Sequence, residues 1–431
     1  MSTREAATFA LEGTLAAAPE AVTKTVQIRV VDTLAAAVAG YEFEDAAVID
    51  RFSRRFEGND ARLLDGSGRT RSLAGAVLAN ATAANVLDID DGHRLVKGHP
   101  AAVVVPAAIA ASETVDASID DLLEAVYVGY ELAVRAGLTI HEETGIYSGT
   151  GSWGAIGAAA AVCRLLECDR DTTEQAIGIA DYHAPRTPIT RGVEKPGMTK
   201  DGIGWGAYTG YEAVELAREG FIASGSPFDN SDRVETLGSR HYVTESYLKP
   251  YPCCRWAQPG LEAALELRRQ PGFTSVNLEH VTVETFSEAT TLTETEPGSV
   301  AEAEYAYPYP VAVALHRGRF SPKDLTAEAR ACTAVTDLAR KVDLETALDL
   351  DERFPKECLA RVRVETSRGV FESGTTRARG ARERPLSETD RFEKHRQLFE
   401  FADVDSVEHI YNILDKSNVS LTELIDTLES G

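Results

Sequence analysis

The chain has 431 residues, of which 43% are hydrophobic, and its formal charge is −24 at pH 7. A chain of this length exceeds one simple core and predicts two domains. The negative charge excludes nucleic acid and anionic membranes as partners, because an acidic surface repels both. Only ten of the 44 basic residues are lysine. This scarcity, with abundant Asp, Glu and Ala, predicts a halophilic protein whose self-repulsion is screened by salt.

Cysteine usage and hydropathy bear on the cellular location. The six cysteines form no C-x-x-C pair, which argues against a zinc site or a secreted disulfide framework. The first residues do not match a signal peptide, and the longest apolar run, 101–111, is too short to span a bilayer. We therefore expect a soluble, cytoplasmic protein with no membrane partner.

Helices are predicted over most of the first 240 residues. Thr3 is expected to cap the first helix, and Ser72 to begin another that ends at an acidic cluster. Residues 61–71 contain Gly66 and favour a small hairpin or loop. Apolar residues at three- and four-residue spacing predict further helices at 22–39, 106–112, 120–136, 154–166, 172–180 and 202–219.

The pattern changes after about residue 240. Residues 281–285 alternate with period two and predict a strand, and 362–371 predict a hairpin. Helices are expected between these strands at 261–268, 301–316 and 327–342. The tail from Pro385 is again helical.

The predicted fold is mainly α with a smaller α+β domain. We assign residues 1–240 to an all-helical domain and residues 241–384 to the α+β domain. Residues 385–431 are expected to form closing helices that rejoin the helical domain.

The segment 88–99 is distinctive because twelve residues carry three carboxylates, two imidazoles and an ammonium. These groups belong to Asp88, Asp90, Asp91, His93, Lys97 and His99. Crowded carboxylates push one another's pKa values apart, so that one group can act as an acid and another as a base. The alternatives are a solvated helix end and a metal site with histidine ligands.

Other residues are candidates by position or rarity. His99 precedes Pro100 at an expected helix N-terminus, which lowers the basicity of an imidazole and favours anions; a capping histidine is the alternative. Lys200 and Lys249 are singled out because lysine is rare here, and surface positions are their alternative. Arg255 offers a bidentate contact to a carboxylate, or else a surface ion pair.

Five segments, in this order, resemble the MmgE/PrpD family, which includes 2-methylcitrate dehydratase, cis-aconitate decarboxylase and iminodisuccinate epimerase. They are Asp88-Ile89-Asp90-Asp91 with Gly98-His99-Pro100, Gly197-Met198-Thr199-Lys200, Lys249-Pro250-Tyr251-Pro252-Cys253-Cys254-Arg255, Tyr305-Ala306-Tyr307-Pro308-Tyr309-Pro310-Val311-Ala312, and Arg384-Pro385-Leu386-Ser387. The resemblance implies a helical domain, an α+β domain, closing helices that rejoin the first domain, and a homodimer.

The resemblance also implies an activity: a cofactor-free, metal-free hydro-lyase, similar to 2-methylcitrate dehydratase, acting on a small hydroxy-polycarboxylate. The implied catalytic residues are Asp88, Asp91, His99, Lys200 and Lys249. The implied substrate-binding residues are His93, Arg255, Tyr309 and Ser148, although Tyr309 could simply pack. Cations would hold the substrate carboxylates, and a histidine or an aspartate would move the proton.

The chain departs from the family pattern at four positions. Ser148 and Gln258 stand where a histidine is common, Gly92 stands where a threonine is frequent, and Asp201 follows Lys200 where the family has a proline. We therefore expect a substrate that differs from that of the well-known members. An epimerase or a decarboxylase on a related di- or tricarboxylate, a non-catalytic binding protein and a metal hydrolase are the alternatives.

Overall fold

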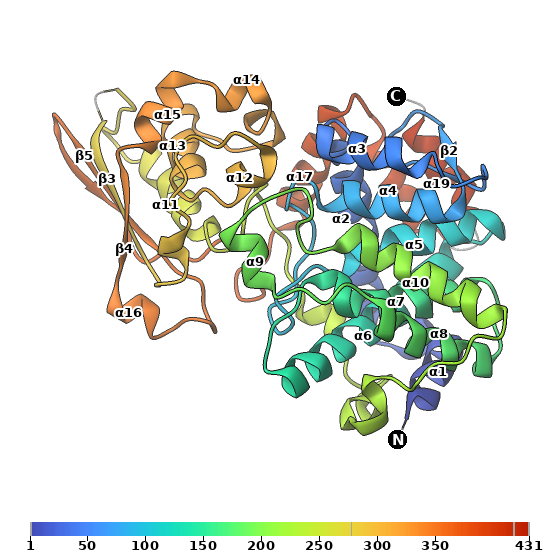
Figure 1. Ribbon diagram of the computed structural model, residues 1–431. Helices are drawn as coiled ribbons and strands as arrows, with labels where there is room; N and C mark the ends of the chain where they lie inside the picture. Colours follow the sequence, from blue (N-terminus) through green and yellow to red (C-terminus); the bar gives the residue numbers. More distant parts are fainter. Residues whose placement is uncertain (1, 277, 417–418, 430–431) are drawn as a thin grey trace.

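A computed structural model describes residues 2–276, 278–416 and 419–429, and it has a helical part and a part built on a sheet (Figure 1). The helices of the first part are α1 (Thr3–Glu12), α2 (Glu20–Gly40), α3 (Glu44–Ser53), α4 (Leu73–Asn85), α5 (Pro100–Thr114), α6 (Ile119–Thr144), α7 (Thr150–Leu165), α8 (Arg170–His183), α9 (Ile189–Glu194) and α10 (Ile203–Arg218). The predicted all-helical first domain is confirmed.

The predicted hairpin and one of the two predicted helix N-caps are found in the structure. The strands β1 (Ala61–Arg62) and β2 (Thr70–Arg71) pair antiparallel and form the expected small hairpin. Ser72 caps α4, because its side chain accepts a hydrogen bond from the backbone of Gly75. The expectation for Thr3 was wrong by one residue: Ser2 is the N-cap of α1 and forms a capping box with Glu5.

Helix α5 is the central helix of the helical part. It is apolar on all sides, and its residues from Pro100 to Ser112 are buried, as expected for a helix surrounded by others. Helices α4, α6 and α7 pack around it. Close approach of α6 and α7 depends on glycine, since a Cβ on Gly157 would lie 2.4 Å from the carbonyl oxygen of Gly129. The N-terminus of α5 is thereby held firmly, and His99 lies at that end.

The second part is a four-stranded sheet in the order β4-β3-β5-β6. Its strands are β3 (Leu278–Thr285), β4 (Val342–Thr346), β5 (Arg361–Thr366) and β6 (Gly369–Glu372), and its helices are α11 (Gln258–Arg268), α12 (Val300–Glu304), α13 (Pro308–Arg317), α14 (Ala327–Arg330), α15 (Thr333–Ala339) and α16 (Leu348–Asp351). β3 runs parallel to β4 and antiparallel to β5. The expected strand and hairpin are confirmed.

Two expected helices of this part are interrupted. The helix expected at 301–316 is divided into α12 and α13, because Pro308 has no N–H to continue the first helix and begins the second. The helix expected at 327–342 is divided into α14 and α15, and Val342 begins strand β4.

The closing helices α17 (Glu388–Phe401), α18 (Val407–Leu414) and α19 (Leu421–Leu428) return to the helical part (Figure 1). α17 and α18 pack against α2, and α19 packs against α5. Lys394 of α17 forms a buried ion pair with Asp32 of α2 and donates to the carbonyl of Ile89 at 2.8 Å. The end of the chain thus supports the acidic segment. None of the described helices has both the length and the apolar character required to cross a membrane.

Candidate active site

The acidic segment between α4 and α5 is held by Lys249. Asp88 has a left-handed backbone, with φ of 47°, a conformation that costs a residue with a Cβ about 1 kcal/mol. The ammonium of Lys249 donates both to the carbonyl oxygen of Asp88 at 2.8 Å and to its carboxylate Oδ1 at 2.7 Å. Both side chains are almost fully buried. This ion pair therefore fixes the turn and places Asp88 in the site.

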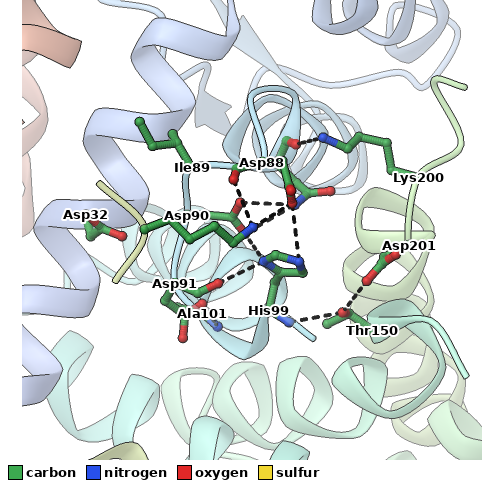
Figure 2. Close-up of polar contacts among 12 residues, drawn as sticks. Asp32, Asp88, Ile89, Asp90, Asp91, His99, Ala101, Thr150, Lys200 and Asp201 are labelled. Atoms are coloured by element: carbon green, nitrogen blue, oxygen red, sulfur yellow. Dashed lines mark hydrogen bonds and ion pairs between the residues drawn. The ribbon is translucent and has the colours of Figure 1, made fainter. Parts of the chain in front are cut away.

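His99 lies between carboxylates at the N-terminus of α5 (Figure 2). Its Nδ1 is 3.0 Å from Asp90 Oδ2 and 2.8 Å from the carbonyl oxygen of Asp91, and its Nε2 is 3.4 Å from Asp88 Oδ1. Burial lowers the pKa of His99, but Asp90 and Asp88 outweigh burial and raise this pKa to about 9. The expected loss of basicity at a helix N-terminus was wrong, because the carboxylates dominate. His99 is an imidazolium at neutral pH.

Asp91 has a different environment from Asp88. Its Oδ1 accepts from the backbone N–H of Ala101 at 3.1 Å, and its Oδ2 accepts from the hydroxyl of Tyr130 at 2.8 Å. Burial raises the pKa of Asp91 to about 6, although Arg29 opposes the shift. Both oxygens are thus used inside the protein, and one of them accepts from the first turn of α5.

Asp88, His99, Lys249 and Arg255 line a cavity of about 500 Å³ between the helical part and the sheet part. Its walls come from residues 88, 94–95, 97–99, 145–147, 188–190, 193, 201, 247, 249, 254–256, 288, 305, 354–355 and 358. The lining also includes the apolar side chains of Leu95, Ile146, Ile189, Val193, Trp256 and Phe354. The cavity therefore combines a charged region with an apolar region, as ligand sites usually do.

Two of the cavity's cations differ in their pairing. Burial lowers the pKa of Lys249, but Asp88 outweighs burial and raises it, so Lys249 stays charged. Arg255 stacks on Tyr247, with its Cζ 3.9 Å from the ring centroid. The Nε of Arg255 is buried and has no hydrogen-bond partner among the described residues. Arg255 is therefore available to an anionic ligand.

Lys200 and Tyr309, two further predicted site residues, do not line the cavity. Lys200 donates to the carbonyl oxygens of Asn85 at 2.6 Å and Val86 at 3.1 Å, and to Glu304 Oε2 at 2.6 Å. It therefore holds the C-terminus of α4, behind the acidic segment. Tyr309 donates to the carbonyl oxygen of Asp324 at 2.6 Å, inside the sheet part.

His93 and Ser148 also lie outside the cavity lining. His93 is fully buried with its Nε2 3.1 Å from the carbonyl oxygen of Tyr242, and burial lowers its pKa to about 3. The backbone N–H of Ser148 donates to His141 Nε2 at 3.1 Å. Burial lowers the pKa of His141 to about 4, so both imidazoles are neutral.

The cavity is also lined by Asp201, which was not among the residues predicted for the site. Asp201 Oδ2 accepts from Thr150 Oγ1 at 3.0 Å, and Thr150 Oγ1 accepts from the backbone N–H of His99 at 3.1 Å (Figure 2). Burial raises the pKa of Asp201. The signal in the sequence was its departure from the family pattern after Lys200. Tyr305 and Tyr247 line the cavity as well; Tyr305 belongs to the fourth family-like segment, whereas Tyr247 had no signal in the sequence.

Gln258 holds the loop that carries Lys249 and Arg255. Its Nε2 donates to the carbonyl oxygens of Tyr251 at 2.8 Å and Cys253 at 2.9 Å. Gln258 is buried and does not line the cavity. Its contacts therefore support the shape of the site.

A metal is the rival use of the acidic cluster. Asp88, Asp90 and His99 each offer a ligand atom, and these atoms lie within 4.8 Å of one another. A divalent cation, however, would compete with Lys249 for Asp88 Oδ1 and would face a protonated imidazole. This donor set therefore suits a proton-transfer group better than a metal.

Comparison with known proteins agrees with this architecture. The MmgE/PrpD N-terminal domain matches residues 4–240 and the MmgE/PrpD C-terminal domain matches residues 251–416. The chain belongs to the MmgE/PrpD family.

Three curated relatives carry related names. A cis-aconitate decarboxylase from Aspergillus terreus is 26% identical over 393 residues, which cover 81% of this chain and 79% of the relative. Another, from Aspergillus terreus strain NIH 2624 / FGSC A1156, is 27% identical over 280 residues, or 58% of this chain and 57% of the relative. The cis-aconitate decarboxylase-like protein oryM of Aspergillus oryzae is 29% identical over 208 residues, or 46% of this chain and 39% of the relative.

Proposed function

We propose that this protein is a lyase that acts on a small polycarboxylate and transfers a proton at a carbon next to a carboxylate. The observation that carries the proposal is the buried imidazolium of His99. It lies beside Asp88 in a cavity that also presents Lys249 and Arg255, whose Nε has no hydrogen-bond partner among the described residues. We propose that the reaction needs no redox cofactor and no metal.

The cations supply the electrostatic part of the reaction. Loss of a proton or of carbon dioxide next to a carboxylate leaves an electron pair that the carboxylate must accept. Lys249 stabilises the charge that develops there, and this contribution is larger in the transition state than in the ground state, while Arg255 holds another carboxylate of the substrate. His99 supplies the proton, because its pKa of about 9 keeps it charged at neutral pH.

Decarboxylation of an unsaturated tricarboxylate is the first candidate reaction. The C–C bond to one carboxylate breaks, its electron pair forms a new C=C bond, and the existing double bond shifts. The carbon next to a second carboxylate then takes the proton from His99, and carbon dioxide leaves. The apolar lining residues of the cavity, such as Leu95, Ile189 and Trp256, favour conversion of a charged carboxylate into neutral carbon dioxide. The names of the three relatives support this candidate.

Dehydration of a hydroxy-polycarboxylate, as by 2-methylcitrate dehydratase, is the second candidate. It needs a base to remove the α-proton and an acid to protonate the departing hydroxide. Burial raises the pKa of Asp88, but Lys249, Lys200 and His99 together outweigh burial and lower it. An ionised Asp88 beside a protonated His99 supplies both groups. Epimerisation would use the same pair without a leaving group.

Turnover of a substrate panel in molar salt tests the proposal. We expect the purified protein to release carbon dioxide from cis-aconitate, or to form a conjugated alkene from citrate or 2-methylcitrate. Proton NMR of the products separates these outcomes from epimerisation. We expect His99→Gln to be inactive and the distant control Arg55→Gln to be fully active. Absence of turnover with every polycarboxylate would contradict the proposal and favour a non-catalytic binding protein.

Three broader expectations are also proposals. The resemblance supports a homodimer, and the composition supports a cytoplasmic protein of a halophile. Light scattering in molar and in dilute salt tests the homodimer and the halophilic character. We expect a dimer that loses its structure when salt is removed, because the −24 charge is then no longer screened.

A further inference from the structure

We propose that Arg94 and Lys97 form, together with Arg255, a subsite for a second anionic group of the substrate, a carboxylate that takes no part in bond breaking. This inference rests on the proposed function and specifies its substrate. Lys249 and His99 would hold the reacting end of the molecule, and the three cations would hold the other end.

The three cations share one place in the cavity. All three line it, and so does the buried thiol of Cys358. Burial raises the pKa of Cys358, and the cations that oppose this rise are Arg255, Arg94 and Lys97. All three cations therefore lie close enough to act on this one thiol, although the chain contributes them from segments more than 150 residues apart.

The backbone presents Arg94 and Lys97 to the cavity on a tight loop. The loop is closed by a hydrogen bond from His93 N–H to the carbonyl oxygen of Gly98, at 2.8 Å. Lys97 has a left-handed backbone, with φ of 49°, which is unfavourable for a lysine and is typical of constrained functional segments. Its Nζ lies 3.7 Å from the ring centroid of Tyr147, at the exposed side of the cavity.

Among the described residues, the three cations lack the carboxylate partners that the buried cations Lys249 and Lys200 have. Lys249 pairs with Asp88, and Lys200 pairs with Glu304. Within the described ranges of the chain, Arg94, Lys97 and Arg255 form no ion pair with a carboxylate.

Burial lowers the pKa of Lys97, and the attraction of Glu288 offsets only part of this effect. Partly buried cations without partners are costly, and an anionic ligand would remove that cost.

Tyr247 lies near one cation of each region, Arg255 and Lys249. Burial raises its pKa to about 12, while Arg255 and Lys249 both lower it, so the phenol lies near each of them. A ligand that reaches both regions therefore needs two carboxylates held apart by a short carbon chain. The cavity of about 500 Å³ has room for such a ligand.

A binding experiment with two carboxylic acids of equal carbon number tests the subsite. Glutarate and valerate have five carbons each, but valerate lacks one carboxylate. Binding is measured by calorimetry at constant salt, in the wild type and in the double variant Arg94→Gln/Lys97→Met. Arg55→Gln is the matched control, because Arg55 is an exposed cation over the ring of Phe52, outside the cavity.

We expect the wild type to bind glutarate more tightly than valerate by roughly tenfold or more, the size of a charge-assisted hydrogen bond. The double variant should lose most of this preference, and the control should keep it. On the enzyme's substrate, the double variant should raise KM by a similar factor while kcat changes less than threefold.

The outcomes separate the two proposals. If the double variant keeps the wild-type preference for glutarate and the wild-type KM, the subsite is wrong while the lyase proposal stands. If the wild type binds neither acid and converts no polycarboxylate, the proposed function itself is wrong. Arg94 is exposed, so Arg94→Gln alone is expected to fold and to give a smaller change in the same direction.

Discussion

The backbone of Gly92 lies directly against the ring of Tyr247. The two residues pair, with Gly92 N–H donating to the carbonyl oxygen of Tyr247 at 3.0 Å and Tyr247 N–H to that of Gly92 at 2.8 Å. A Cβ on Gly92 would lie 2.1 to 2.5 Å from three atoms of the Tyr247 side chain. The glycine thus makes room for a ring that carries Arg255 on its face.

Gly92→Ala is therefore expected to move Tyr247 and to misplace Arg255. We expect KM for the substrate to rise about tenfold or more, and the free energy of unfolding to fall by about 1–3 kcal/mol, the usual cost of overpacking. Steady-state kinetics and denaturant unfolding measure both effects. Gly374→Ala is the control, because no atom lies within 4 Å of a Cβ placed on Gly374; equal effects in the two variants would refute this account.

Because Asp88 and Lys249 form a buried ion pair, we expect removal of one partner to destabilise the protein more than removal of both. Lys249→Met leaves a buried carboxylate uncompensated and should lower the free energy of unfolding by about 3–5 kcal/mol. The double variant Asp88→Asn/Lys249→Met should regain part of this stability but none of the activity, because both groups face the cavity. Recovery of activity in the double variant would show that the pair is only structural.

For the ion pair of Lys200 and Glu304 we expect the double variant to recover activity as well as stability. Lys200 contacts the end of α4 and Glu304 but does not line the cavity, so we expect it to position the acidic segment. Lys200→Met should reduce stability and kcat together, and Lys200→Met/Glu304→Gln should restore part of both. If the double variant regains stability while kcat stays low, Lys200 contacts the substrate, as the sequence predicted.

The pKa of His99 predicts how stability depends on pH. Its value of about 9 exceeds the 6.5 of an unperturbed histidine. The stabilising contribution is therefore complete below pH 6.5 and is lost as the pH rises through 9, and it amounts to about 3 kcal/mol at most.

The difference in unfolding free energy between the wild type and His99→Gln should therefore shrink over this range, as denaturant titrations at several pH values would measure. The activity should fall above pH 9 for the same reason. A difference that is constant or grows with pH would contradict the assignment.

Much of the fold could be predicted from the sequence, because an element that is buried on one face has hydrophobic residues at regular spacing. Helix α6 and strand β3 follow this spacing, whereas α4 is buried on nearly all sides and its start was predicted from its capping residue, Ser72. Strand β4 could not be predicted in this way, since only its first residue, Val342, is buried.

The site was predicted less completely than the fold. The charged segment and the resemblance identified Asp88, His99, Lys249 and Arg255, all of which line the cavity. Sequence does not show which way a side chain points. His93 and Lys200 therefore carried the same signal, although one is a neutral buried imidazole and the other binds the end of α4.

The central claim is that His99 delivers a proton to a carbon next to a carboxylate. Proton NMR of the reaction in deuterium oxide tests it most directly. We predict that the wild type incorporates deuterium at that carbon of the product, and that His99→Gln does so at least about a hundredfold more slowly. Equal incorporation by the wild type and His99→Gln, or none by the wild type with any polycarboxylate, would contradict the claim.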